Sequence, residues 1–149
     1  MVALVQRAGR AAVRVDSELV SSIGRGMLIL LGVQRGDTER DLALAVRKCA
    51  GLRIFPDDAG KMNRSIADIH GEALVVSQFT LFGDVRRGLR PFFGEAADPP
   101  EAERLYEAFM AALADTGIPV RGGVFGASMQ VELVNEGPVT IWIDTREIV

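Results

Sequence analysis

The chain has 149 residues, of which 48% are hydrophobic and 25% are charged, and its formal net charge is −3. This length and composition are typical of one globular domain over residues 1–149, and they exclude an intrinsically disordered chain. Proteins that cover duplex nucleic acid usually carry a basic surplus, so the charge disfavours broad duplex binding but leaves local contact with a few phosphates open.

The single cysteine and the single histidine restrict the available chemistry. Cys49 alone forms no internal disulfide or Cys-rich zinc site, and His70 alone forms no multi-histidine metal site. We therefore expect no metal and no cofactor. The N-terminus lacks the pattern of a signal peptide, and the longest apolar run, Met27–Leu31, is far below the ~20 residues of a membrane helix. A cytoplasmic protein without a membrane partner is expected.

The first third of the chain predicts strands followed by a helix. Alternation indicates strands over Val2–Arg7 and Ala11–Val15, and a third over Glu18–Ile23 after the turn signal Asp16-Ser17. The continuous apolar run Met27–Val33 predicts a strand that is buried on both faces.

A helix is predicted from Asp37 or Thr38, its N-cap candidates, to Gly51. Its buried stripe at helical spacing comprises Leu42, Ala45, Val46 and Cys49. Cys49 is therefore expected to pack in the core, with a reactive thiol as the alternative.

Further along, Leu52–Phe55 predicts a short strand, Pro56–Gly60 a turn and Glu72–Thr80 a strong strand. Periodicity then disappears until a second helix, which opens at Asp98-Pro99-Pro100-Glu101 and ends at Gly117.

Two alternating strands, Ser128–Val134 and Val139–Asp144, are expected to be joined by the turn Asn135-Glu136-Gly137-Pro138. The elements together predict an α/β (α+β mixed) fold: a curved, largely antiparallel, barrel-like sheet with two helices packed on one side.

Polar side chains gather at the end of the strand Glu72–Thr80. Period-two geometry places Ser77 and Phe79 on one face and Gln78 and Thr80 on the other. Burying such polar groups unpaired would cost about 1–3 kcal/mol each, so they indicate a site, with a strand that simply emerges into solvent as the alternative. The only histidine, His70, lies in a predicted turn, where a solvated side chain is more typical than a catalytic base.

Two other segments contain candidate functional residues. Arg86, Arg87 and Arg90 lie beside Phe92 and Phe93, and guanidinium groups next to aromatic rings suit RNA phosphates and bases, with a solvated charged loop as the alternative. Gly137-Pro138 by itself predicts a plain turn with a trans peptide bond.

Taken together, these motifs resemble the D-aminoacyl-tRNA deacylases (D-tyrosyl-tRNA deacylases). The resemblance rests on Ser77-Gln78-Phe79-Thr80-Leu81, Arg87-Gly88-Leu89-Arg90-Pro91 and Asn135-Glu136-Gly137-Pro138-Val139-Thr140. It covers essentially the whole chain, except that Thr145–Val149 is similar to an added tail.

The resemblance implies a homodimeric, metal-independent hydrolase. Its substrate would be the ester between a D-amino acid, or glycine, and the 3′-terminal adenosine of tRNA. The Gly137–Pro138 peptide would be cis and would enter the neighbouring subunit's pocket, where its backbone carbonyls meet the substrate's α-ammonium and Cα–H and leave no room for an L side chain.

The resemblance also assigns residues. Catalytic positions are Ser77, Gln78, Phe79 and Thr80; substrate-binding positions are Arg7, Ala102, Phe125, Met129, Gly137 and Pro138. Phe125 would stack on the terminal adenine. Arg7 would steady the Gly-Pro tip, with a surface arginine at a strand end as the alternative. The arginines at 86, 87 and 90 are expected to contact the acceptor stem.

For the chemistry, we expect the backbone N–H groups of Phe79 and Thr80 to form an oxyanion hole while water attacks with help from the ribose 2′-OH of the substrate. Thr80 as a nucleophile is the alternative, and it would need a base. Two other functions stay open: a non-catalytic nucleic-acid-binding protein on the same fold, and an esterase for another substrate class.

Overall fold

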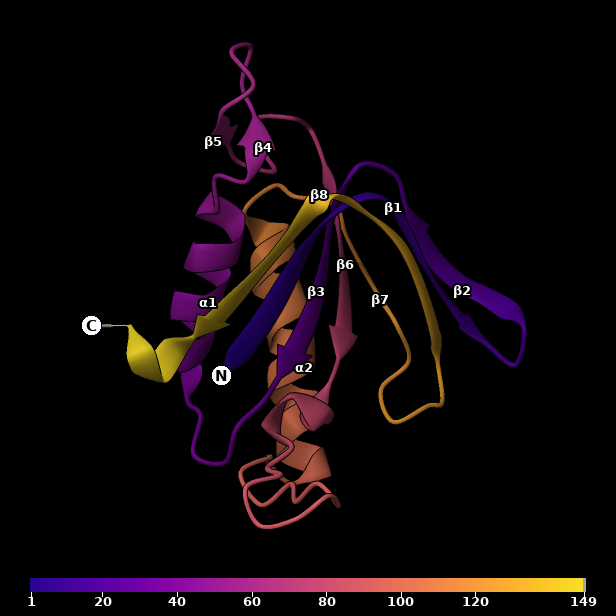
Figure 1. Ribbon diagram of the computed structural model, residues 1–149, viewed down its shortest axis with the longest axis vertical. Coiled ribbons are helices and arrows are strands. Elements are labelled where there is room, and N and C mark those ends of the chain that lie inside the picture. The colour runs from indigo at the N-terminus through magenta and orange to yellow at the C-terminus, as the bar shows by residue number, and fades with distance from the viewer. Residues whose placement is uncertain (149) are drawn as a thin grey trace.

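A computed structural model describes residues 1–148, and its centre is a six-stranded mixed sheet with two helices (Figure 1). The elements in chain order are β1 (Val2–Val15), β2 (Glu18–Ile23), β3 (Gly26–Gly32), α1 (Glu39–Gly51), β4 (Phe55–Pro56), β5 (Met62–Arg64), β6 (Glu72–Ser77), the 3₁₀ helix η1 (Phe79–Phe82), α2 (Pro99–Asp115), β7 (Val120–Gly122), β8 (Gln130–Asp144) and the 3₁₀ helix η2 (Thr145–Glu147).

The sheet has the order β2-β1-β3-β6-β7, with β8 added on the free edge of β1. β6 runs parallel to β3 and β7, and every pairing of β1 is antiparallel. A hydrogen bond of 2.7 Å from Ser21 Oγ on β2 to the carbonyl of Gly122 on β7 connects the two ends of this order. The expected curved, barrel-like mixed fold is therefore confirmed, as a nearly closed barrel.

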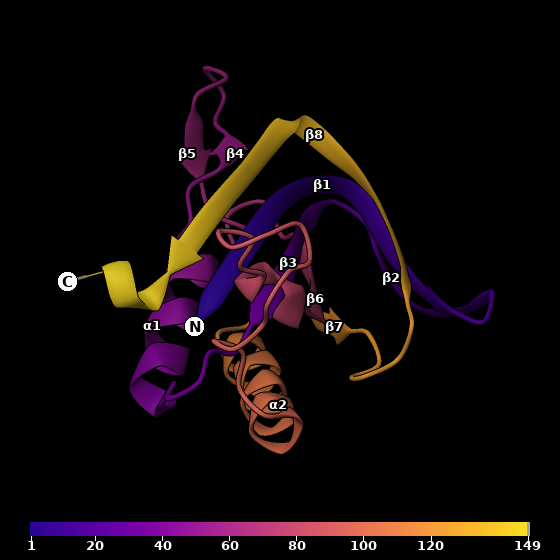
Figure 2. The same cartoon turned by 60° about the horizontal axis from the view of Figure 1, so that its bottom comes forward.

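β1 is one continuous strand, so the prediction of two separate strands at the N-terminus is wrong. Its first half, Val2–Ala8, pairs with β3, and Ala11–Val15 pairs with β2. Irregularities in register between Gln6 and Arg10 bend the strand instead of ending it. Figure 2 shows β1 and β8 following the same arc.

β8 is also continuous, which corrects the predicted turn at Asn135-Glu136-Gly137-Pro138. Residues on both sides of this segment pair antiparallel with β1: Val134 with Arg10, and Thr140 with Gln6. The chain therefore keeps its direction through the segment and only bulges, because five residues of β8 from Asn135 to Val139 are opposite a shorter stretch of β1. Sequence patterns report alternation but do not report whether a break is a reversal or a bulge.

The two helices cover one face of the sheet. Leu42 and Cys49 on α1 and Leu105 and Phe109 on α2 pack with Ile29 of β3 in one buried cluster, and Figure 2 shows both helices on the same side. The opposite face of the same strands holds a second cluster with Leu28, Leu74 and Val76. This confirms that the apolar strand near residue 30 is buried on both faces.

Helix ends follow the predicted signals. Thr38 is the N-cap of α1, and its N–H donates a hydrogen bond of 3.0 Å to Asp41 Oδ2. Asp98 is the N-cap of α2, with Pro99 at the first helical position. The buried Cys49 packs in the core as expected, and burial raises the pKa of its thiol to about 12. No helix within residues 1–148 has the length and apolarity needed to cross a membrane.

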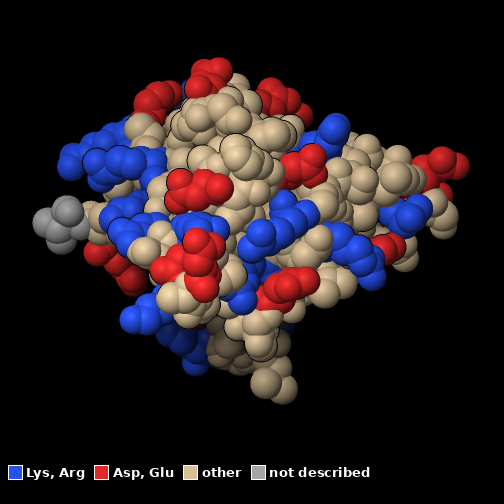
Figure 3. Space-filling model, turned by 90° about the horizontal axis from the view of Figure 1, so that it is seen from above, with Lys and Arg blue, Asp and Glu red and all other residues tan. Residues whose placement is uncertain are grey.

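Other predicted boundaries differ. Of the strand expected over Leu52–Phe55, only Phe55 belongs to a strand, β4, while β5 and β7 were not predicted because three residues carry no periodic signal. The segment after β8 packs back on the start of β1, where the N–H of Thr145 donates to the carbonyl of Met1. Val149, the end of the predicted tail, lies outside the described residues. Figure 3 shows Lys and Arg interspersed with Asp and Glu on the face seen from above.

Candidate active site

The candidate site begins where β6 ends. β3 and β6 are parallel, so their carboxyl ends meet at one edge of the sheet, and Leu31 is the partner of Ser77. The N–H of Gln78 still donates 2.8 Å to the carbonyl of Leu31, but the chain then turns into η1. The prediction that the strand continues to Thr80 is wrong, because β3 offers no further ladder partner beyond this point. The period-two faces assigned to Phe79 and Thr80 do not apply.

A cavity of about 570 Å³ opens at this edge, between β6, the start of α2 and the segment before β8. Its volume lies in the range of small-ligand sites. It is lined by Val33, Arg35, Val76, Ser77, Gln78, Phe79, Phe93, Ala96, Ala97, Asp98, Pro99, Ala102, Phe125, Gly126, Ala127, Met129 and Val131. Most of these side chains are apolar, and the polar groups are concentrated at the end of β6 and at the rim.

Six of the ten residues singled out from the sequence line this one cavity: Ser77, Gln78, Phe79, Ala102, Phe125 and Met129. Thr80 follows directly and is exposed, and its hydroxyl oxygen accepts a hydrogen bond from Gln78 Nε2. The Phe125 ring lies 6.0 Å from the ring of Tyr106, whose hydroxyl donates 2.8 Å to the carbonyl of Val75. The aromatic wall is thereby anchored to the core.

The other three, Arg7, Gly137 and Pro138, lie away from the cavity lining. Gly137 and Pro138 are exposed, and the peptide bond between them is cis, as the resemblance implies. The guanidinium of Arg7 donates to the carbonyl of Glu136 through Nε at 2.7 Å and to the carbonyl of Ile54 through Nη1 at 2.7 Å. Arg7 is thus fixed directly beneath the bulge of β8, which favours the tip-steadying role over a free surface arginine.

The register of the sheet gives the separation between the two groups. Arg7 is the partner of Met27, whereas Ser77 is the partner of Leu31 on the same strand β3. Four residues of extended strand correspond to about 13 Å. The Gly-Pro tip and the cavity of one chain therefore lie toward opposite ends of the central strands.

Two backbone N–H groups at the start of η1 have no hydrogen-bond partner among the described residues. η1 begins at Phe79, and the first hydrogen bond of its turn is donated by Leu81 to the carbonyl of Gln78. The N–H groups of Phe79 and Thr80 precede it and have no backbone partner among the described residues. Such neighbouring donors at the end of a strand are suited to bind a negatively charged oxygen.

Among the described residues that line the cavity there is no histidine, and the one carboxylate, Asp98, is paired with an arginine. His70 has a left-handed backbone with φ of 52° and precedes β6, so the whole length of that strand separates it from Ser77. The charged side chains in the cavity lining are Arg35 and Asp98, which form an exposed ion pair of 3.4 Å at the rim. Within residues 1–148, His, Cys, Asp and Glu form no group of three or more that could hold a metal ion.

Sequence reasoning did not identify Arg35 and Asp98 as site residues, and it placed Phe93 with the loop arginines and not in this cavity. Arg35 follows the buried strand β3, and an arginine just after the carboxyl end of a strand parallel to β6 is a usable signal. Phe93 packs edge to face against Phe79, with ring centroids 5.0 Å apart. Nothing in the local sequence pairs these two rings, because the contact depends on the path of the loop between them.

Comparisons with known proteins find relatives over almost the whole chain. A family model described as D-Tyr-tRNA(Tyr) deacylase matches residues 4–144. A D-aminoacyl-tRNA deacylase of Geobacter sulfurreducens is 54% identical over 146 residues, which cover 98% of this chain and 96% of that protein. A D-aminoacyl-tRNA deacylase of Thermomicrobium roseum is 56% identical over 148 residues, which cover 99% of this chain and 96% of that protein.

Two solved structures have the same fold. One titled "c-Myc DNA Unwinding Element Binding Protein" superimposes with a TM-score of 0.92 at 44% identity, covering 97% of this chain and 98% of its own. Another, titled "Structural Analysis of a probable eukaryotic D-amino acid tRNA deacylase", has a TM-score of 0.81 at 20% identity, covering 95% and 97%, and supports the fold alone.

Fold, cavity and matches together define an enzyme of the aminoacyl-tRNA deacylase class. Within that class, the chain belongs to the D-Tyr-tRNA(Tyr) deacylase family.

Proposed function

We propose that this chain hydrolyses the ester that joins a D-amino acid, or glycine, to the 3′-terminal adenosine of tRNA, and that two copies of the chain act together. D-aminoacyl-tRNA deacylation is the activity of its family. The observation that carries the proposal is the cavity at the end of β6, where Ser77, Gln78 and Phe79 meet two free backbone N–H groups.

The oxyanion of the tetrahedral intermediate is stabilised by the N–H groups of Phe79 and Thr80. They are held in place because η1 starts here and the N–H of Gln78 is bound to β3. Fixed backbone donors need no reorganisation when the charge develops, and the loss of one such donor from an active site typically slows turnover by about 10²–10³.

Water is the nucleophile, and the 2′-OH of the terminal ribose assists its attack. An aminoacyl ester is already activated, and the cavity edge carries no histidine or carboxylate that could act as a base, apart from Asp98, which is paired with Arg35. Thr80 is a weaker candidate because its hydroxyl is held by Gln78 and does not line the cavity.

The terminal adenine occupies the apolar part of the cavity. Phe125 and Met129 provide an aromatic and a thioether surface, and Ala102 on α2 leaves room for the base. Stacking on an aromatic ring is the usual way in which a protein holds an unpaired base.

Chirality is selected by the Gly137-Pro138 tip of a second copy. Both residues are exposed and the Arg7 guanidinium fixes the preceding carbonyl, yet the tip lies about 13 Å along the strands from the cavity of its own chain. A partner's tip that enters the cavity would present main-chain atoms to the α-carbon and exclude an L side chain. This makes the homodimer the functional unit, and we expect it to work in the cytoplasm, where tRNA is charged.

Release of D-tyrosine and of L-tyrosine from charged tRNA tests the activity. We expect release of the D form only, and equal release of both would contradict the chiral filter. Binding of tRNA without release of either would instead support a non-catalytic nucleic-acid-binding protein, while equally fast cleavage of simple D-amino-acid esters would support a general esterase.

The nucleophile is tested by two further measurements. Thr80→Ala should keep turnover within about threefold, because no covalent step uses the hydroxyl. A substrate that ends in 2′-deoxyadenosine should be cleaved at least about 100-fold more slowly, the usual scale of general-base assistance. A large loss of turnover in Thr80→Ala, together with an unchanged rate for the substrate that ends in 2′-deoxyadenosine, would assign the attack to Thr80.

A further inference from the structure

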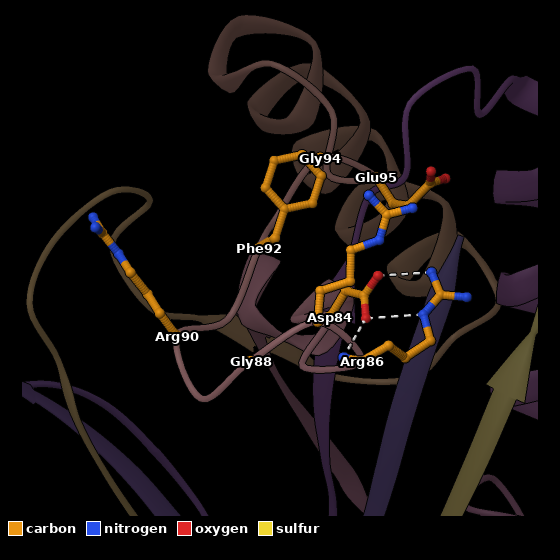
Figure 4. A pocket seen from close by; sticks show the side chains of 8 residues that line it. Asp84, Arg86, Gly88, Arg90, Phe92, Gly94 and Glu95 are labelled. Carbon is orange, nitrogen blue, oxygen red and sulfur yellow. Dashed lines mark hydrogen bonds and ion pairs between the residues drawn. The ribbon is translucent and has the colours of Figure 1, made fainter.

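A second cavity of about 630 Å³ lies beside the first, under the loop that follows η1. It is lined by Asp84, Arg86, Arg87, Gly88, Arg90, Phe92, Gly94 and Glu95 (Figure 4). We propose that this cavity binds the single-stranded RNA just before the terminal adenosine, with Arg87 and Arg90 on its phosphates and Phe92 under a base. The proposal rests on the proposed function for the position of the terminal adenosine.

The two cavities share one wall. Phe92 and Gly94 face the second cavity, whereas Phe93 and Ala96 face the first. Phe93 also packs on Phe79, so the loop is coupled directly to the end of β6. A strand of RNA whose last nucleoside occupies the first cavity must leave it over one of its walls, and this wall carries arginines that form no ion pair among the described residues, whereas Arg35 at the rim is paired with Asp98.

The loop has a defined shape. Asp84 and Phe92 form an antiparallel bridge at its base, with the N–H of each donating to the carbonyl of the other at 2.8 and 2.9 Å. Asp84 also binds Arg86 through Oδ1 and Oδ2, at 2.9 Å to Nε and 2.6 Å to Nη2. Figure 4 shows Arg86 folded onto Asp84 and Arg90 extended away from this pair.

Arg87 and Arg90 are free to bind an anion. Both are exposed, and among the described residues neither forms an ion pair with a carboxylate. Of the two carboxylates in the lining, Asp84 is bound to Arg86, and Glu95 lies 3.9 Å from Arg146 and accepts a bond from Gln34. These two unpaired guanidinium groups form a local positive charge on a chain whose net charge is −3.

Phe92 adds an apolar platform. Its ring lies so close to Gly94 that a Cβ there would collide with it, yet the residue remains 69% exposed. A ring that is backed on one side and open on the other, next to free arginines, matches a nucleotide, which has both a planar base and a phosphate. An inorganic anion would use the arginines alone.

The experiment compares two substrates: D-tyrosyl-tRNA, and the minimal ester D-tyrosyl-adenosine, which lacks all preceding nucleotides. For the double variant Arg87→Ala/Arg90→Ala we expect a KM for D-tyrosyl-tRNA raised at least about tenfold with little change in kcat, because binding contacts remote from the reacting bond are lost. The kinetics with the minimal ester should not change. Phe92→Ala should show the same contrast.

A matched control is Arg47→Ala/Lys48→Ala, which removes the same charge from the exposed surface of α1, away from both cavities. The control should leave both substrates unaffected. An equal loss with both substrates, or a loss in the control as large as in the double variant, would overturn the proposal.

Equilibrium binding of uncharged tRNA separates this inference from the proposed function. Two phosphate contacts on a single strand should lower the slope of log Kd against log salt by about 1.4 in the Arg87→Ala/Arg90→Ala variant. If the wild-type chain cleaves neither ester, the proposed function fails, but weaker and less salt-dependent tRNA binding by this variant would still support the RNA site. Unchanged binding would overturn it.

Discussion

Arg7 Nε donates a hydrogen bond of 2.7 Å to the carbonyl oxygen of Glu136, the residue before Gly137. Its Nη1 makes an equally short bond to the carbonyl of Ile54, so one guanidinium connects the bulge of β8 to the segment before β4. The exposed tip therefore has a fixed base, and the Asn135 side chain also closes the bulge, since its Oδ1 accepts a hydrogen bond of 2.7 Å from the N–H of Val139.

Arg7→Ala should impair activity more than stability. Each hydrogen bond from a charged group contributes about 1.5–3 kcal/mol, and 1.4 kcal/mol corresponds to a factor of ten in rate. We expect kcat/KM for D-tyrosyl-tRNA to fall at least about tenfold and the preference for D over L to shrink. Arg10→Ala, an exposed arginine on the same strand, should leave both unchanged. An unaltered D/L ratio in Arg7→Ala would contradict the steadying role.

Gly137→Ala should disturb the same tip. Gly137 has φ of +136°, and a Cβ at this position would lie 3.0 Å from Arg7 Nη2 and 2.9 Å from Val139 Cγ2. We expect kcat/KM for the D substrate to drop at least tenfold, while the circular dichroism spectrum stays that of the wild type because the tip is exposed.

The control for this change is Gly24→Ala. Gly24 lies in an ordinary backbone region with open space around its Cα, so the added methyl group meets nothing within 4 Å. It should retain full activity. Full activity of Gly137→Ala would show that the tip does not approach the substrate.

The predictability of the fold depended on how local each signal was. The apolar run of β3 and the stripe of α1 are repeated over several residues, so both elements were predicted, and Thr38 was one of the two N-cap candidates. The end of β6 was not predicted, because it depends on the point after Leu31 at which β3 no longer pairs with β6. The bulges that keep β1 and β8 continuous arise from their pairing with each other, which alternation does not report.

The same distinction between local signals and strand pairing applies to the residues of the site. Ser77, Gln78 and Phe79 are consecutive, and polar residues after a buried strand mark them in the sequence. Arg35 and Phe93 reach the same cavity from other loops, and only the parallel pairing of β3 with β6 brings these segments together. The proposed sharing of one site between two copies rests on the separation of tip and cavity along the strands of one chain, about 13 Å, which no sequence pattern measures.

Asp37→Asn should destabilise the fold. The Met1 ammonium lies 2.7 Å from Asp37 Oδ1, and both groups are almost completely buried. Breaking a buried ion pair by removing one charge costs about 3–5 kcal/mol, since the other charge is left unpaired. Urea unfolding should show a loss of about that size. Asp58→Asn, which removes an exposed pair with Arg64, should cost less than about 1 kcal/mol, and similar losses in the two variants would contradict the prediction.

The Arg86 guanidinium, which hydrogen-bonds Asp84, lowers the pKa of that carboxyl to about 2, from its ordinary value of 3.8. A lowered pKa in the folded state means that the pair stabilises the loop fully above about pH 4 and loses its effect as the pH falls toward 2. Arg86→Ala should raise the pKa of Asp84 toward its ordinary value, as an NMR titration of the carboxyl carbon would show. Arg87→Ala, which removes a neighbouring guanidinium not bonded to Asp84, should leave the low pKa in place. A pKa that stays near 2 in Arg86→Ala would mean that the backbone N–H of residue 86 alone is sufficient to hold it there.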